Sequence, residues 1–278
     1  MKRRKNGKSQ KYARESGAER ALRKVLSAVL LVLLFLAFYL IRRGWDPGTG
    51  VPQDPAQTQE TAASSQAVSD QGDLSDAQAA DFTLSMVPPY SGRPYTDIHG
   101  DVPFFTEEEL TSEAFHEYWP LDELGRCTGA YACVGPETLP TQKRGDISMV
   151  KPTGWNTTRY EDIDGEMLFN RCHLIGHLLT GQDANERNLI TGTRYMNVEG
   201  MLPFEESVVT YVEGTGHHVM YRVRPYFDGD NLVCAGVLME AESVEDPLVR
   251  FCVFCYNVQP GFEIDYATGD NRRSAPKQ

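Results

Sequence analysis

Basic residues are scarce over most of this sequence. The 278-residue chain has 27 Lys and Arg against 39 Asp and Glu, and residues 1–43 hold twelve of the basic side chains but only two of the acidic ones. Residues 44–278 therefore hold 15 basic and 37 acidic side chains, a formal charge of about −22. A surface this acidic does not attract polyanions by bulk electrostatics. Binding of nucleic acid would need a local basic site or a metal ion.

Lys and Arg are absent from residues 46–83, where the only aromatic residue is Phe82. A stretch rich in Gln, Ala, Ser, Asp and Pro buries too little apolar surface to offset chain entropy. We therefore expect residues 44–85 to be a disordered acidic linker. Disorder throughout is excluded, because 41% of the whole chain is apolar. Aromatic residues become dense from about residue 86, and residues 86–278 are expected to form the folded domain.

A single long hydrophobic run occupies residues 25–41, without a charged side chain. Its length nearly spans the ~30 Å hydrocarbon layer of a bilayer. Ten basic residues precede it, so the positive-inside rule makes residues 1–24 a cytoplasmic tail and residues 25–43 a single transmembrane anchor. The rest of the chain would then lie outside the cell. A cleaved signal peptide is the alternative, but its apolar core is usually about 7–15 residues long and precedes a small-residue cleavage site.

The folded part shows helix and strand signals of different strength. Residues 106–110 look like a helix start, with Thr106 as the cap and acidic residues in the first turn. Residues 193–214 are the best helix candidate, ending at Gly214. Three strand-like runs follow, at residues 219–227, 232–240 and 250–258. Residues 228–231 read as a hairpin turn between the first two, so the domain is predicted to be α+β, with an antiparallel meander beside a helix.

Residues 169–206 concentrate His, Asn, Arg and Glu side chains. Histidine can act as a general base near neutral pH, and the amide oxygen of asparagine suits a hard cation such as Mg²⁺. Arginine matches phosphate oxygens bidentately. Base, metal ligand and phosphate clamp are the parts that metal-assisted phosphodiester hydrolysis needs. The alternative interpretation is a polar, hydrogen-bonded loop next to a helix.

The same region carries a family resemblance. Residues 170–173, Asn-Arg-Cys-His, resemble a variant of the Asp-Arg-Gly-His motif of the DNA/RNA non-specific endonucleases, which are ββα-metal or His-Me finger enzymes. The subfamily that the chain resembles is that of the streptococcal DNA-entry nucleases. Supporting stretches lie at residues 149–157, 188–205, 218–227 and 256–270, and the similarity covers roughly residues 86–270. Asn170 and Cys172 depart from the motif's Asp and Gly.

This resemblance implies a ββα-metal nuclease core with an antiparallel sheet and a packed helix. His173 matches the general base, and Asn197 matches the single protein ligand of Mg²⁺, for which Mn²⁺ is a substitute. Glu205 matches an acid that orients a water on the metal, and Asn188 matches a supporting residue near the base. The phosphate contacts would be Arg171 and Arg194, with Arg171 counted also among the catalytic residues.

The resemblance further implies cleavage of DNA, and also of RNA, to 5′-phosphate products with little sequence preference. We therefore expect a membrane-anchored extracellular nuclease, acting in DNA uptake or in nucleic-acid scavenging. Two alternatives are a non-catalytic surface module that binds DNA or a partner, and a secreted antibacterial nuclease toxin. A zinc hydrolase with His173 and His177 on one helix face is a further alternative, against which Gly176 argues.

Six cysteines are present, and an exported domain permits disulfides. Cys127 and Cys133 could close a short loop. Cys252 and Cys255 are three apart on an expected strand, so they should point to opposite faces and not pair with each other. Cys234 could pair with one of these two across neighbouring strands. The sequence leaves the pairing open.

Overall fold

The computed structural model describes residues 82–156 and 158–275. The expected cytoplasmic tail, the membrane anchor and nearly all of the linker lie outside these residues. Within the described part of the chain, no helix is both long enough and apolar enough to cross a bilayer.

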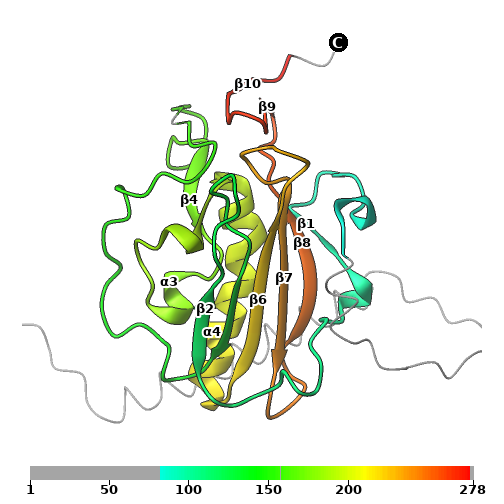
Figure 1. The fold of residues 1–278 in the computed structure, drawn as a ribbon, viewed down its shortest axis with the longest axis vertical. Helices are drawn as coiled ribbons and strands as arrows, with labels where there is room; N and C mark the ends of the chain where they lie inside the picture. Colours follow the sequence, from blue (N-terminus) through cyan, green and yellow to red (C-terminus); the bar gives the residue numbers. More distant parts are fainter. Residues whose placement is uncertain (1–81, 157, 276–278) are drawn as a thin grey trace, which may run out of the picture. The chain divides into compact units, whose positions relative to one another are not determined.

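A six-stranded antiparallel sheet forms the centre of the described fold (Figure 1). Its strands lie in the order β1-β8-β7-β6-β3-β2. The strands are β1 (Tyr95–Asp97), β2 (Phe115–Tyr118), β3 (Ala130–Val134), β6 (Val219–Tyr226), β7 (Gly236–Ser243) and β8 (Arg250–Tyr256). The three longest, β6 to β8, are consecutive in the chain and pair as the antiparallel meander that the three strand-like runs predict.

The two faces of this sheet are buried against different segments. On β8, Val253 and Cys255 belong to the main core, which the helix α4 (Leu202–Thr215) completes through residues such as Val208. Cys252 and Phe254 belong to a second core on the opposite face. Because successive side chains of a strand point to opposite faces, Cys252 and Cys255 are separated as the sequence predicts.

A separate two-stranded hairpin precedes α4. It pairs β4 (Phe169–His173) with β5 (Leu189–Thr193), and the helical segment η4 (Met196–Met201) leads from it into α4. The order strand, strand, helix is the ββα arrangement that the family resemblance implies.

The side chain of Asn257 links this hairpin to the large sheet. Asn257 is fully buried. Its Oδ1 accepts a hydrogen bond from the backbone N–H of Thr193 at 2.8 Å, and its Nδ2 donates to the carbonyl oxygens of Thr191 and Cys234, both at 3.0 Å. Thr191 and Thr193 lie on β5, whereas Cys234 lies just before β7. One amide therefore fixes where β5 lies relative to the sheet.

Short elements complete the described fold. They are η1 (Leu84–Met86), η2 (His99–Asp101), α3 (His177–Thr180), η3 (Glu186–Asn188), β9 (Phe262–Ile264) and β10 (Asn271–Arg273). The last two form a small antiparallel hairpin near the C-terminus.

The helix expected over residues 193–214 is confirmed to within one residue at each end, but it is not regular throughout. Thr193 still belongs to β5, and its Oγ1 accepts a hydrogen bond from the N–H of Met196. Residues 196–201 form a π-helical turn, a rare geometry that often marks a functional site. Helical structure begins at Arg194, becomes regular α-helix from Leu202, and ends before Gly216 at a positive φ of 75°.

Two other expectations are wrong in detail. Residues 106–110 form a turn rather than a helix start, because the Glu109 carboxylate binds both the backbone N–H of Thr106 and the guanidinium of Arg222. The strand expected over residues 232–240 is β7, which runs instead from Gly236 to Ser243, because residues 228–235 form a longer connection closed by the Ala235 N–H and the Tyr226 carbonyl.

All six cysteines are buried and form no disulfide. The Cys127 thiol donates to the carbonyl oxygens of Glu186 and Leu189, and the Cys133 thiol donates to that of Thr111. The loop closure considered for Cys127 and Cys133 is therefore absent, and so is a bond from Cys234 to β8.

Replacing Asn257 with Ala should destabilise the domain strongly. The change leaves one buried N–H and two buried carbonyls without partners, and each such group costs about 1–3 kcal/mol. We expect a loss of at least about 3 kcal/mol in the free energy of unfolding, measured with urea. Asn156→Ala is the matched control, because it removes a single exposed hydrogen bond to Asp270. Equal losses in the two variants would contradict the linking role of Asn257.

Candidate active site

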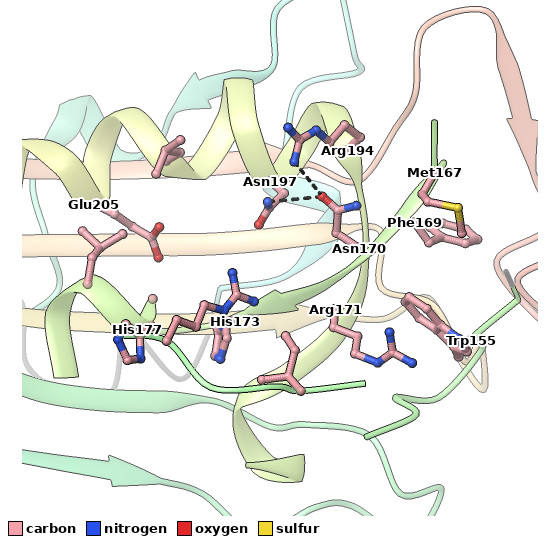
Figure 2. Close-up of a pocket in the computed structure, with 15 residues that line it drawn as sticks. Trp155, Met167, Phe169, Asn170, Arg171, His173, His177, Arg194, Asn197 and Glu205 are labelled. Carbon is pink, nitrogen blue, oxygen red and sulfur yellow. Dashed lines mark hydrogen bonds between the residues drawn. The ribbon is translucent and has the colours of Figure 1, made fainter. Parts of the chain in front are cut away.

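A cleft of about 690 Å³ opens beside β4, between the start of α4 and the loop of residues 144–155. It contains most of the side chains on which the sequence argument rests (Figure 2). The lining residues include Arg144, Trp155, Asn170, Arg171, His173, His177, Arg194, Asn197 and Glu205. Asn188 is the one expected site residue that does not line it.

His173, at the end of β4, is held in one tautomer. Its Nε2 lies 3.0 Å from the backbone carbonyl oxygen of Asp183. A carbonyl only accepts hydrogen bonds, so Nε2 carries the proton and Nδ1 keeps a lone pair. Only 7% of the residue is exposed, and burial is the main cause that lowers the pKa of His173 to about 4. The imidazole is therefore neutral at physiological pH and able to accept a proton at Nδ1.

Glu205 reaches the cleft from the first turn of α4. It is 7% exposed, and burial is the main cause that raises the pKa of this carboxyl to about 7. The backbone N–H of Gly176 and the charge of Arg144 act in the opposite direction. A Cβ atom at Gly176 would lie 2.6 Å from Glu205 Oε1, so glycine is required for this close approach. Burial outweighs these two contacts, so the carboxyl is harder to ionise than a solvent-exposed glutamate.

Asn197 lies at the start of the π-helical turn and presents its amide to the same cleft. Its Nδ2 donates to Asn170 Oδ1 at 3.3 Å, which orients the amide. Its Oδ1 accepts a hydrogen bond from the Cys172 thiol at 3.0 Å. Because an amide oxygen has two lone pairs, one remains for a cation. Asn197 and Glu205 together offer oxygen donors of the kind that hard divalent cations prefer.

The two departures from the family motif are accommodated locally. Cys172 is fully buried and packs against Gly192 on β5, where an added Cβ atom would lie only 2.7 Å from Cys172 Cβ. The missing side chain at Gly192 therefore makes room for the thiol. Asn170 uses its Oδ1 to accept from both Asn197 and Arg194, as the dashed lines in Figure 2 mark.

Arg171 is already engaged by the protein. Its Nε donates to the Val150 carbonyl at 2.5 Å and its Nη2 to the Ser148 carbonyl at 2.8 Å. The guanidinium also lies 4.2 Å from the centre of the Trp155 ring. These contacts hold the loop of residues 148–155 against β4. Its role as a phosphate contact stays a prediction, and its remaining donors still line the cleft.

Arg194 also has partners. Its Nη2 lies 2.6 Å from Asp164 Oδ2, and its Nη1 donates to Asn170 Oδ1 at 3.4 Å. Asp164 is highly exposed, so this ion pair costs little to exchange for another anion. A phosphate contact by Arg194 stays a prediction as well.

Arg144 is a cleft residue that the sequence argument did not assign. It is exposed and lines the cleft. Within the described residues it forms no hydrogen bond or ion pair. Its positive charge nevertheless lowers the pKa of both Glu205 and His173. It lies in a loop that matches no motif, so only the fold reveals it as the cation nearest to both groups.

Asn188 is fully buried behind the cleft. Its Oδ1 accepts from the backbone N–H of Ile175, and its Nδ2 donates to the Ile175 carbonyl, both at 2.9 Å. Ile175 is two residues after His173, so Asn188 fixes the turn by which the chain leaves the base. Asn188 therefore lies behind His173 and does not line the cleft.

His177 begins α3, whereas His173 ends β4, so the two do not share a helix face. The Nδ1 of His177 lies 3.0 Å from Asp183 Oδ1, although the pair is poorly aligned and neither atom makes a hydrogen bond. Within the described residues, no group of three or more His, Cys, Asp or Glu is placed to hold a metal ion. The zinc arrangement considered for His173 and His177 is therefore absent.

Solved structures of nucleases share this fold. NucA from Streptococcus agalactiae with magnesium bound is 23% identical and has a TM-score of 0.57, over 66% of this chain and 91% of that one. The metal-free form of NucA is 22% identical with a TM-score of 0.59, over 69% and 92%. The Sda1 nuclease with bound zinc is 22% identical with a TM-score of 0.56, over 66% and 97%.

The family assignment comes from the sequence itself. The family model of the DNA/RNA non-specific endonucleases matches residues 107–245, which is half of the chain. That range includes β4, β5 and α4 with all the expected site residues. The chain therefore belongs to the DNA/RNA non-specific endonuclease family.

Proposed function

We propose that this protein is a magnesium-dependent endonuclease that hydrolyses phosphodiester bonds of DNA and RNA with His173 as the general base. The observation that carries the proposal is the state of His173. Its Nε2 is tied to the Asp183 carbonyl and burial keeps the ring neutral, so Nδ1 can take a proton from an attacking water.

The residues present fit a hard divalent cation. Asn197 would ligate it through Oδ1, and Glu205 would act on it through water. Both groups line the cleft that contains His173. The cation would supply Lewis-acid stabilisation of the charge that develops on the phosphate and the leaving oxygen. One structural neighbour holds magnesium and another zinc, which supports a divalent cation here; manganese is expected to substitute.

The basic side chains would bind the substrate backbone. Arg144 has no internal partner among the described residues and is the first candidate for the scissile phosphate. Arg194 would exchange its exposed ion pair with Asp164 for a neighbouring phosphate. Contacts of this kind carry no sequence information, which supports non-specific cleavage of DNA and RNA. By resemblance to the family, the products would carry 5′-phosphates.

Replacing His173 with Ala should reduce cleavage by roughly 10²–10⁴-fold, the usual contribution of general acid–base catalysis. A plasmid-nicking assay measures this, with folding checked by thermal unfolding. His177→Ala is the control, because its ring also lies in the cleft but contacts only Asp183 and Gln142. Near-full activity of His173→Ala together with a dead His177→Ala would reassign the base.

The pH profile separates His173 from Glu205. The pKa of His173, about 4, lies below the usual value, so its base form persists down to that pH. The pKa of Glu205, about 7, lies above its usual value. At low magnesium, kcat/KM should therefore decrease as soon as the pH drops below about 7. Glu205→Gln should remove this decrease, so that kcat/KM falls only near pH 4, where His173 becomes protonated. A limb near pH 6.5 that survives in Glu205→Gln would indicate a solvent-exposed histidine base.

Magnesium dependence tests the metal site. Asn197 contributes a neutral oxygen, so affinity should be weak and activity should need millimolar rather than trace magnesium. Asn197→Ala should abolish cleavage at any practical concentration, whereas Asn197→Asp should bind the cation more tightly yet cleave slowly. Glu205→Gln should be milder, because it acts through water. Cleavage rate against magnesium concentration distinguishes the three, and full activity of Asn197→Ala would overturn the site.

We also propose that residues 25–41 anchor the protein in the cell membrane with the nuclease domain outside, where DNA uptake or scavenging of nucleic acid would use it. The uncharged run and the ten preceding basic residues support this. Full-length protein should fractionate with membranes, and protease added to intact cells should remove the domain. A mature form in the medium that begins near residue 44 would show a cleaved signal peptide instead.

A further inference from the structure

The cleft has an apolar end that the proposed chemistry does not use. Trp155, Met167 and Phe169 line it there, and Figure 2 shows them on the far side of Arg171 from His173 and Glu205. Phe169, Arg171 and His173 alternate along β4 and so point to one side of the strand. At about 3.3 Å per residue, Phe169 lies roughly 13 Å along the strand from the base. The apolar end therefore continues the catalytic cleft.

The Trp155 ring is held as a rigid surface. It packs against the small core of Ile163, Leu168 and Phe169, and the Arg171 guanidinium lies 4.2 Å from its centre. Arg171 is in turn fixed by two carbonyl oxygens of the same loop. Trp155 is nevertheless only partly buried, and its indole N–H has no hydrogen-bond partner in the described part of the chain. The Arg171 guanidinium covers one face of the ring, so a base can stack only on the opposite face of this fixed aromatic ring, which lines the substrate cleft.

We infer that Trp155 stacks against an unpaired nucleobase of the substrate, one or a few nucleotides from the phosphate that is cut at His173. This rests on the proposed nuclease function. The faces of bases in a duplex are covered by their neighbours, so only single-stranded or locally unpaired nucleic acid can offer one. The favoured substrate class is therefore single-stranded DNA or RNA.

The distribution of charge also favours an unpaired nucleobase as the group that contacts Trp155. Arg171 and Arg194 lie between the apolar end and the catalytic residues, where they meet the phosphates that flank a stacked base. Residues 44–278 carry about −22 formal charges, so binding by general electrostatic attraction is weak. Stacking adds attraction that does not depend on that charge, and every base provides a face for it. Stacking on Trp155 is therefore compatible with cleavage that has little sequence preference.

The test uses single-stranded oligonucleotides in which one linkage is an ordinary phosphodiester and all others are phosphorothioates. An abasic site is moved, one position at a time, to each side of the cleavable linkage. Wild-type protein should lose about 5- to 100-fold in kcat/KM at one position, the usual worth of one base stacked on an aromatic ring. Trp155→Leu should lose a similar factor on the intact strand and be insensitive to the abasic site. Trp155→Phe should keep most of the sensitivity.

Trp119→Leu is the matched control, because Trp119 does not line the cleft and the abasic penalty should remain unchanged. If the wild-type protein cleaves the linkage but is indifferent to an abasic site at every position, the stacking inference is overturned, whatever the variants do. If a Trp155 variant does not fold, the wild-type abasic scan still decides the matter. Absence of any cleavage by the wild type would instead count against the nuclease proposal itself.

Discussion

One buried amide decides where the catalytic hairpin lies. Asn257 meets two positions of β5 and one carbonyl before β7, with no solvent available to replace these partners. An amide with this many internal bonds tolerates neither a shift of β5 nor a rotation of its own side chain. His173 pairs with Leu189 at the other end of the same hairpin, and Asn197 follows β5 by four residues. The placement of both therefore depends on this one contact.

Burial acts on the two ionisable groups of the cleft in chemically different ways. It favours the neutral form of each, which lowers the pKa of His173 and raises that of Glu205. For the histidine this produces a base at physiological pH. For the glutamate it leaves a carboxyl whose ionisation depends on positive charge nearby, of which Arg144 is the protein's own source. Burial in one cleft thus accounts for both shifted pKa values, that of His173 and that of Glu205.

The sequence predicts much of the sheet because its signal is local. The strand-like runs correctly indicate β6 and β8, and the motif around His173 identifies the hairpin. Asn197 and Glu205 line one cleft although part of a π-helical turn lies between them. Glu109 looks like part of a helix start but is used by Arg222, a residue 113 positions away. Arg144 carries no local pattern, and the stretch that contains Trp155 resembles the family without assigning that residue a role, so only the tertiary structure shows that both line the cleft.

The way Arg171 is used has a consequence for how a substrate would be received. It joins strand β4 to the loop that carries Trp155, through two carbonyl oxygens and the indole ring. That wall of the cleft is consequently ordered before anything binds. A ligand then loses less conformational entropy on association than it would if the loop had to be immobilised around it. Arg171 thus preorganises this wall of the cleft, so a substrate would bind with little rearrangement of the protein.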